Sequence, residues 1–587
     1  MSLFTFQAML FASCAFVSSG TIKAAGFTDA RTARNSLYTR AKLLYDLKCE
    51  KDALASAQGA ILLTFQSSSV DLHAGSLWLS IAIENAMVYG AHRFDSDNEC
   101  DRNDPHRNTR RRVWWSILIR DRILPLGLRR HLQITPRTFD LSLDPITETD
   151  LEDEIYHSEV YDPDTKRLLA RVLQVQCELC MVLTNIIMLV YAPKAFGQSS
   201  LAEESDLSSI IRQIEEGRTS LEEWSNYAKA ALAPAINTEK AHESVALYFG
   251  LAFLYYHAAR LALCQFEALA LSVHRYHIQG PQGEVFGRIQ NELEDAISCI
   301  DDTMRRFLAR GVAHHLPIST IAYTALPLLL NALDIKLSTS RLQSVTRKRR
   351  FRHYANVMQL YQDRYDGTDS VAMFIQKTLQ FASSMLIPQS QDAHNPGSVS
   401  QSWSEIFSQN PQLYLRIALS LDYAFTCGHF PEDTELPGLI GNLIADSDIQ
   451  HSDASISVPG LRPILQNSPI PSFSELLEST TDDGLDEPEE PPRPAPATVH
   501  ASPTSLASIL NRPDSPIQRF GDSSGSYYSF PFTPFSQSEE LSQPVLNESP
   551  KDECHTFFNF ESPVPESSSS SGSGLMKGDH ASSVSAQ

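Results

Sequence analysis

The chain has 587 residues, 42% of them hydrophobic, so it is long enough for a large core and, at ~150 residues each, for roughly two to four domains. Its net charge of −22 is unevenly spread, because residues 431–587 hold 24 Asp and Glu against 6 Lys and Arg, which leaves 46 acids and 42 bases in residues 1–430. The nearly neutral body excludes a broad electrostatic DNA clamp, since phosphate binding needs a concentrated basic face.

The N-terminal 20 residues are apolar and have no basic residue before Lys23, so they are expected to form a buried helix rather than a secretory signal. No apolar run reaches the 18 or so uninterrupted residues expected of a membrane span, and no membrane contact is expected. The nine cysteines are odd in number and scattered, as is typical of a reducing compartment. Cys177 and Cys180 form a lone CxxC in an apolar helical pattern, which favours two core thiols over a zinc site.

From residue 28 to about residue 385 the apolar residues repeat with helical period between short polar breaks, with almost no alternating strand pattern. The pattern predicts an all-α fold, a large multi-helix domain. The predicted helices are residues 31–45, 54–65, 77–89, 110–124, 165–191, 207–232, 238–274, 286–309, 320–337, 346–361 and 370–385, and an apolar island further on predicts one more at 411–425.

The segment predicted as helix 110–124 is apolar on almost every side, which indicates a place inside a sizeable core. Pro125 cannot continue the helix and Gly127 relaxes the turn, so the helix is expected to end at Leu124. Its arginines at positions 110–112 fall on the first turn.

Asp121 falls within the apolar arc of this helix, where an ionised carboxylate costs several kcal/mol, roughly, unless a cation meets it. Arg129 or Arg130, in the loop just after the helix, is the expected partner because a guanidinium fork suits a buried carboxylate. The alternative is that Asp121 lies at a partly wet helix end and pairs with nothing.

Arginines, paired tryptophans and an acid follow one another here in a specific order, namely Arg111, Arg112, Trp114, Trp115, Arg120, Asp121, Arg122, Arg129, Arg130, Phe139 and Asp140. This order and spacing resemble the signature of the fungal-specific transcription factor homology domain, the helical regulatory region found downstream of a zinc binuclear cluster. Residues 402–440 also resemble the end of this domain in one subgroup of the family, the regulators of cutinase and similar genes, so the likeness covers roughly residues 5–440. It implies that residues 1–440 form a regulatory domain that starts part-way, and that the signature residues are structural.

The DNA reader of that family is a six-cysteine cluster with two zinc ions, and the 587 residues contain no such cluster. The resemblance therefore implies no cofactor in this chain. It leaves two interpretations: an incomplete gene product, or a regulator whose DNA contacts are made by a partner.

The densest basic run of the body consists of Arg347, Lys348, Arg349, Arg350 and Arg352. A solvated helix start is favoured over a DNA surface for this run, and a nuclear import signal is a further interpretation that stays open. Asp301 and Asp302 resemble the start of an aspartate-rich prenyl-diphosphate site, but Arg305 stands where the third acid is needed.

Residues 441–587 are rich in Ser, Pro, Asp and Glu, and such a composition predicts a disordered acidic tail. Aromatic residues among its acids are typical of an activation segment, and a plain solvated tail is the alternative.

The interpretation reached from these patterns is a nuclear fungal transcriptional regulator of a pathway-specific metabolic or secondary-metabolite gene set, and no enzyme. The expected partners are coactivators, a DNA-binding partner or a second copy, and a small-molecule inducer. Two alternatives remain: a helical enzyme acting on an isoprenoid, and a helical ligand-sensing or scaffold module without direct DNA binding.

Overall fold

The computed structural model describes residues 1–68, 70–93, 106–139, 144–192, 207–236, 241–274, 282–338, 340–386, 402–436 and 440. All of them belong to the first of two units, residues 1–533, and the second unit, residues 534–587, lies outside the described residues. The tail predicted at residues 441–587, and its predicted disorder, also lie outside them.

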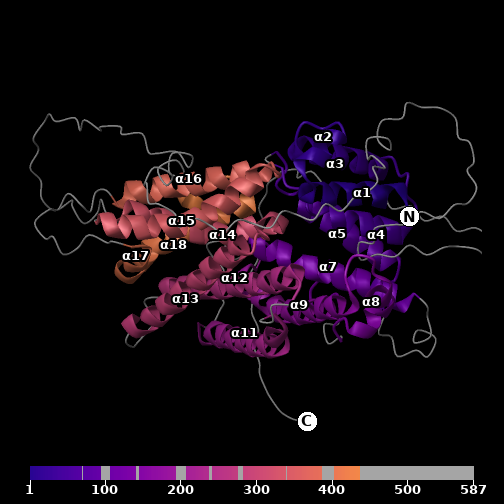
Figure 1. Cartoon of the computed structure of the whole chain (residues 1–587). Coiled ribbons are helices and arrows are strands. Elements are labelled where there is room, and N and C mark those ends of the chain that lie inside the picture. Colours follow the sequence, from indigo (N-terminus) through magenta and orange to yellow (C-terminus); the bar gives the residue numbers. More distant parts are fainter. Residues whose placement is uncertain are drawn as a thin grey trace, which may run out of the picture. The chain divides into compact units, whose positions relative to one another are not determined.

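The described residues form an all-α structure with no β-strand among them (Figure 1). Its α-helices are α1 (Leu3–Ser13), α2 (Ser19–Ala24), α3 (Ala30–Asp46), α4 (Ala53–Leu63), α5 (Ala74–Val88), α7 (Arg107–Leu128), α8 (Glu152–His157), α9 (Pro163–Val190), α11 (Leu207–Ile236), α12 (Glu243–Val273), α13 (Gln282–Ala309), α14 (Ser319–Lys336), α15 (Arg341–Gln362), α16 (Gly367–Leu386), α17 (Trp403–Gln409) and α18 (Pro411–Cys427). Short 3-10 turns occur at Cys14–Phe16, Ala91–Arg93, Glu148–Leu151, Ala313–His315 and Asp433–Glu435.

Local signals in the sequence explain where several helices begin and end. Asp29 and Asp52 accept backbone amides at the starts of α3 and α4, and Asp162 does the same for α9, whose first residue is a proline. At the far end of the body, Gly428 adopts a left-handed conformation (φ 83°) that terminates α18. These are the residue types that relieve the unpaired amides and carbonyls of helix ends.

Every helix predicted between residues 28 and 385 is present, with its ends displaced by a few residues. One predicted end was wrong for an instructive reason: α7 runs through Pro125 to Leu128 rather than ending at Leu124. A proline in the last turn removes only one helical hydrogen bond, and left-handed Arg129 (φ 55°) caps the helix by donating its amide to Pro125 O. Gly127 stays helical, where a Cβ would lie 3.3 Å from Ala322 Cβ.

Two hydrophobic cores share α7. The smaller core gathers α1, α3, α4 and α5 around Val113, Trp114 and Leu118 in the first half of α7. The larger core gathers the helices from α9 to α18 and includes Ile123 and Leu126 from the second half of α7. A helix that is apolar on almost every side can serve both cores, because it has no face that must meet water.

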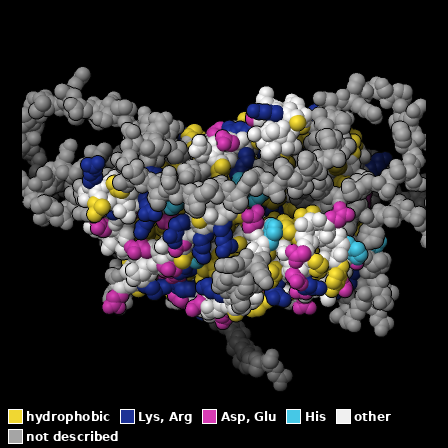
Figure 2. Space-filling model, in the orientation of Figure 1, with side chains coloured by type: hydrophobic (Ala, Val, Ile, Leu, Met, Phe, Trp, Pro, Cys, Tyr) yellow, Lys and Arg dark blue, Asp and Glu magenta, His cyan; other side chains and the backbone are white. Residues whose placement is uncertain are grey.

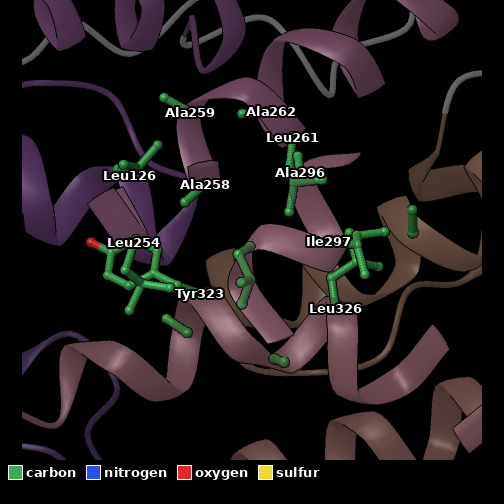
Figure 3. Packing of buried hydrophobic residues seen from close by; sticks show 14 of the residues in the cluster. Leu126, Leu254, Ala258, Ala259, Leu261, Ala262, Ala296, Ile297, Tyr323 and Leu326 are labelled. Atoms are coloured by element: carbon green, nitrogen blue, oxygen red, sulfur yellow. The ribbon is translucent and has the colours of Figure 1, made fainter. Parts of the chain in front are cut away.

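The larger core is built around α12, which packs against α9, α11 and α13. Figure 3 shows Leu254, Ala258 and Leu261 of this helix among side chains of α7, α13 and α14. By length and mean hydropathy both α9 and α12 contain windows that could cross a membrane, although polar residues interrupt them, and those windows are 50% and 72% buried within the protein. Burial of that extent is also what core helices of a folded protein show.

Candidate functional site at the signature helix

Asp121 is completely buried, as its position on the helix wheel predicts, and it accepts hydrogen bonds from three donors. Its two carboxylate oxygens accept the amides of Gln133 (3.1 Å) and Ile134 (3.0 Å), and Arg122 Nη1 donates to Oδ2. Burial raises the pKa of Asp121, and the Arg122 guanidinium and the two amides oppose that shift. The carboxylate thereby fixes the segment after α7 against the helix itself.

The cation that meets Asp121 is Arg122, so the expectation of Arg129 or Arg130 was wrong. Consecutive helix residues point about 100° apart, which argues against such a pair on a wheel, but the guanidinium of Arg122 turns back to reach Asp121. Its Nε donates to Thr184 Oγ1 on α9 at 2.8 Å. Through this hydrogen bond the Asp121–Arg122 pair also connects α7 to α9.

Arg129 and Arg130 bind elsewhere, and both reach α18. Arg129 Nε lies 2.7 Å from Asp422 Oδ1, and both side chains are more than 90% buried. Arg130 donates to Ser76 Oγ on α5 (2.8 Å) and to the carbonyl oxygen of Thr426 (3.2 Å). The two arginines thus join the end of α7 to helices that lie far away in the sequence.

The first turns of α7 carry arginines, whose charge opposes the positive end of the helix dipole. Arg111 is buried there and its Nε lies 2.9 Å from Asp150 Oδ1, which supplies the compensating charge. Arg112 is half-buried and donates to Asn108 O within the helix. Asp140, the last residue of the predicted signature, lies outside the described residues.

The two tryptophans point into the smaller core. Trp114 is fully buried and packs on Phe139, with ring centroids 4.9 Å apart. Trp115 is 1% exposed and belongs to the same core. Both indoles fill space between helices of this core.

Arg120 differs from the other buried arginines at and just after α7, because it has no carboxylate partner among the described residues. It donates to Thr64 Oγ1 and Thr64 O, both at 2.8 Å, and its guanidinium lies 4.1 Å above the Phe65 ring. Within the described part of the chain no carboxylate lies within 4.0 Å of it, whereas Arg111, Arg122 and Arg129 each have one. Burial lowers the pKa of Arg120 to about 10, which leaves the group charged at neutral pH.

The cysteines and aspartates whose spacing suggested a zinc site or a prenyl-diphosphate site lie on two different helices, α9 and α13. Cys177 and Cys180 are buried thiols in the apolar part of α9, and burial raises the pKa of both. On α13, Asp302 pairs with Arg305 at 2.6 Å, and burial raises the pKa of Asp301 to about 6. Over the described ranges no three His, Cys, Asp or Glu side chains gather as metal ligands would.

The basic run lies inside α15, which begins at Arg341, and so it does not mark a helix start as expected. Arg349, Arg350 and Arg352 are exposed, whereas Arg347 is half-buried and donates to Asp334 O at 2.7 Å. Figure 2 shows Lys and Arg side chains gathered over α13 and α15. Arg305, Arg349 and Arg352 there help burial to lower the pKa of His353.

Comparison with known families gives a match over the first part of the chain. Residues 2–226, which include α7 and its tryptophans, match the family described as the fungal specific transcription factor domain. Over these residues the chain is therefore similar to a fungal specific transcription factor domain. The match ends within α11, but α9 and α11 pack against α12, so the packed helices continue beyond the matched residues.

Several curated proteins are similar to parts of this chain. Cutinase transcription factor 1 beta of Fusarium vanettenii is 29% identical over 202 residues, which are 32% of this chain and 22% of that protein. A transcription factor of Fusarium pseudograminearum is 37% identical over 148 residues, 24% of this chain and 16% of that protein. The fusaric acid cluster transcription factor of Gibberella moniliformis is 26% identical over 251 residues, 41% of this chain and 34% of that protein.

The chain spans less than half the length of each of these relatives. No solved structure matches it.

Sequence reasoning missed the acidic partners of the signature arginines. Asp150 and Asp422 both lie outside the signature, and Asp422 is 293 residues from Arg129. The available signal was Asp422 itself, an acid inside the apolar stretch predicted as helix 411–425. A buried acid needs a cation, but a sequence alone does not say which one.

Proposed function

We propose that the protein is a fungal transcriptional regulator that controls a pathway-specific set of genes. The observation that carries the proposal is the match of residues 2–226 to the fungal specific transcription factor domain, together with relatives whose names describe cutinase and fusaric acid cluster transcription factors. The buried ion pairs of Arg111, Arg122 and Arg129 are structural contacts within the body of the protein. The expected role of the body is thus regulatory and not catalytic.

The second part of the proposal concerns activation. Residues 442–587 interleave aromatic and acidic residues, and aromatic side chains are the anchors that fill hydrophobic grooves of partner proteins. We propose that coactivators bind this tail, and that a separate DNA-binding chain brings the regulator to its genes. Acidic residues by themselves would only keep the tail solvated.

A reporter experiment tests activation directly. The whole chain, and residues 442–587 alone, are fused to an unrelated DNA-binding domain, and both fusions should drive the reporter. Changing the tail aromatics to alanine with all acids retained should abolish the signal; these residues are Tyr527, Tyr528, Phe530, Phe532, Phe535, Phe557, Phe558 and Phe560. The matched control changes the serines at 567–571 to alanine and should leave the signal intact. Silent fusions, or a fully active aromatic variant, would remove the tail from the proposal.

Nuclear action is the corresponding proposal for localisation. A fluorescent fusion of the whole chain should accumulate in nuclei. Replacing exposed Arg349, Arg350 and Arg352 with glutamine tests whether α15 carries the import signal, because these side chains are accessible without unfolding the helix. A cytosolic parent fusion would instead favour a sensing or scaffold module.

A further inference from the structure

A cavity of about 100 Å³ lies where the two hydrophobic cores meet. The connection between α4 and α5 contributes Thr64 and Leu72, and α7 contributes Arg120 and Leu124. The starts of α14 and α16 and the end of α18 contribute Ile321, Val371, Phe374 and Phe425 to its walls. The lining is thus mainly apolar, with one buried guanidinium in its wall.

Arg120 lines this cavity, and its positive charge has no carboxylate partner among the described residues. Its side chain is only 6% exposed, and Nε and Nη2 are both occupied by Thr64. Nη1 donates no hydrogen bond to any described residue. Arg34 is also buried and has no ion pair among the described residues. Its two Nη groups donate to the carbonyl oxygens of Phe11 and Phe65, and it does not line the cavity. An uncompensated buried charge is costly, and an anion entering the cavity would relieve it.

The N-terminal turns of three helices also line the cavity and add partial positive charge to that of Arg120. The cavity is lined by Gly75 in the first turn of α5, Ser319 at the start of α14 and Gly367 at the start of α16. Neither α5 nor α14 has a side chain that caps its first amides. The partial positive charge of helix N-termini favours an anion, whereas the amides of Thr320 and Ile321 in α14 are already paired with Pro317 O and Ile318 O.

We propose that this cavity binds a small organic monocarboxylate, whose carboxylate meets Arg120 and whose apolar body lies against Leu124, Ile321 and Val371. Two observations limit the size and the charge of the ligand. The volume is below the ~150 Å³ cavity that holds the six carbons of benzene, so it admits an unbranched apolar chain of only about four carbons beyond the carboxylate at Arg120. Exposed Asp71 also lines the cavity, and its charge disfavours a dianion such as phosphate.

An occupant would contact both cores at once, since α5 belongs to the smaller core and α14, α16 and α18 to the larger one. It would therefore stabilise one arrangement of the two cores over others. In this way the inference supplies a ligand class for the regulator proposed above. Its biological use rests on that proposal, but binding is measured without any transcriptional readout.

Calorimetry on the purified full chain tests the inference with pentanoate as the probe. Pentanol, pentylamine and inorganic phosphate are the matched neutral, cationic and dianionic controls. We expect saturable pentanoate binding on the order of 1 mM or tighter, the range open to a ligand of about seven heavy atoms, with each control at least tenfold weaker. Equal binding of pentanoate and pentanol, or no saturable pentanoate binding, would overturn the inference.

Two variants locate the site. Arg120→Met should weaken pentanoate binding at least tenfold and leave pentanol binding unchanged. Because that variant also loses the contacts to Thr64, Val371→Phe provides an independent test: it fills the apolar end and should abolish binding of both molecules. The matched control is Val182→Phe on α9, a half-buried valine outside the cavity. Retained pentanoate binding in a folded Val371→Phe protein would contradict this site. A silent reporter with intact pentanoate binding would instead count against the proposed function alone.

Discussion

Replacing Asp121 with alanine should destabilise the protein by roughly 3–5 kcal/mol, the range measured when one partner of a buried ion pair is removed. The structure supplies the reason for a value in that range. Arg122 has no exposed side-chain area, so its guanidinium would stay buried without a counter-charge. The amides of Gln133 and Ile134 would lose their acceptor as well, and a buried unpaired donor costs about 1–3 kcal/mol by itself. The contributions overlap, because one relaxation can relieve all three groups.

Urea unfolding followed by tryptophan fluorescence suits this test, since Trp114 and Trp115 lie on the same helix as Asp121. The matched control is Asp164→Asn, which removes a carboxylate with 90% of its side chain exposed that pairs with Arg167 at 2.8 Å. This control should change stability by less than ~0.5 kcal/mol. A loss under ~0.5 kcal/mol for Asp121→Ala, equal to an ordinary surface substitution, would refute the reasoning.

A double-mutant cycle separates the pair from the rest of the network. Adding Arg122→Met to Asp121→Ala removes the stranded cation, so the double variant should be less destabilised than the sum of the two single variants. We expect a coupling of roughly 1–3 kcal/mol. Strict additivity would mean that the two charges do not stabilise each other.

Three further predictions rest on other parts of the body. Arg129→Met should cost roughly 3–5 kcal/mol in urea unfolding, because it strands buried Asp422, and a change under ~0.5 kcal/mol would show that the two do not interact. Burial, followed by the charge of Arg260, lowers the pKa of His257 from 6.5 to about 3, so the unfolded state takes up the proton first and stability falls as pH drops below 6.5. At pH 5 that loss is about 2 kcal/mol; His257→Gln should not show it, whereas exposed His157→Gln should behave like the parent. In mobility-shift experiments at physiological salt the purified chain should bind DNA only weakly and without sequence preference, and binding to one sequence that survives competitor DNA would contradict this.

The helices were predictable because their apolar period and their caps are local properties. Asp52 before α4 and Asp162 with Pro163 before α9 are examples that can be read directly from neighbouring residues. The end of α7 was not predictable in this way. Pro125 is a strong local stop signal, but left-handed Arg129 satisfies the end of the helix, and the buried pair with Asp422 fixes that residue.

The site was predictable only in part. The burial of Asp121 was predicted from the wheel, because its position falls within the apolar arc of the helix. Its partner did not follow, since side-chain length lets Arg122 reach around the helix against the rule for adjacent residues. The cavity beside Arg120 could not be predicted at all, because its walls come from five helices and one connection spread over more than 300 residues.

The distance in sequence between Arg129 and Asp422 has a consequence for synthesis of the protein. The two residues are 293 positions apart, and ribosomes add about 5–20 residues per second. Once made, α7 must therefore wait roughly 15–60 s before the carboxylate that matches its last arginine exists. During that interval buried Arg129 has no counter-charge and the larger core around the end of α7 is incomplete, which is the condition under which nascent chains bind chaperones or aggregate. Slow translation of residues 130–420 should consequently lower the yield of folded protein more than slow translation of residues 1–106.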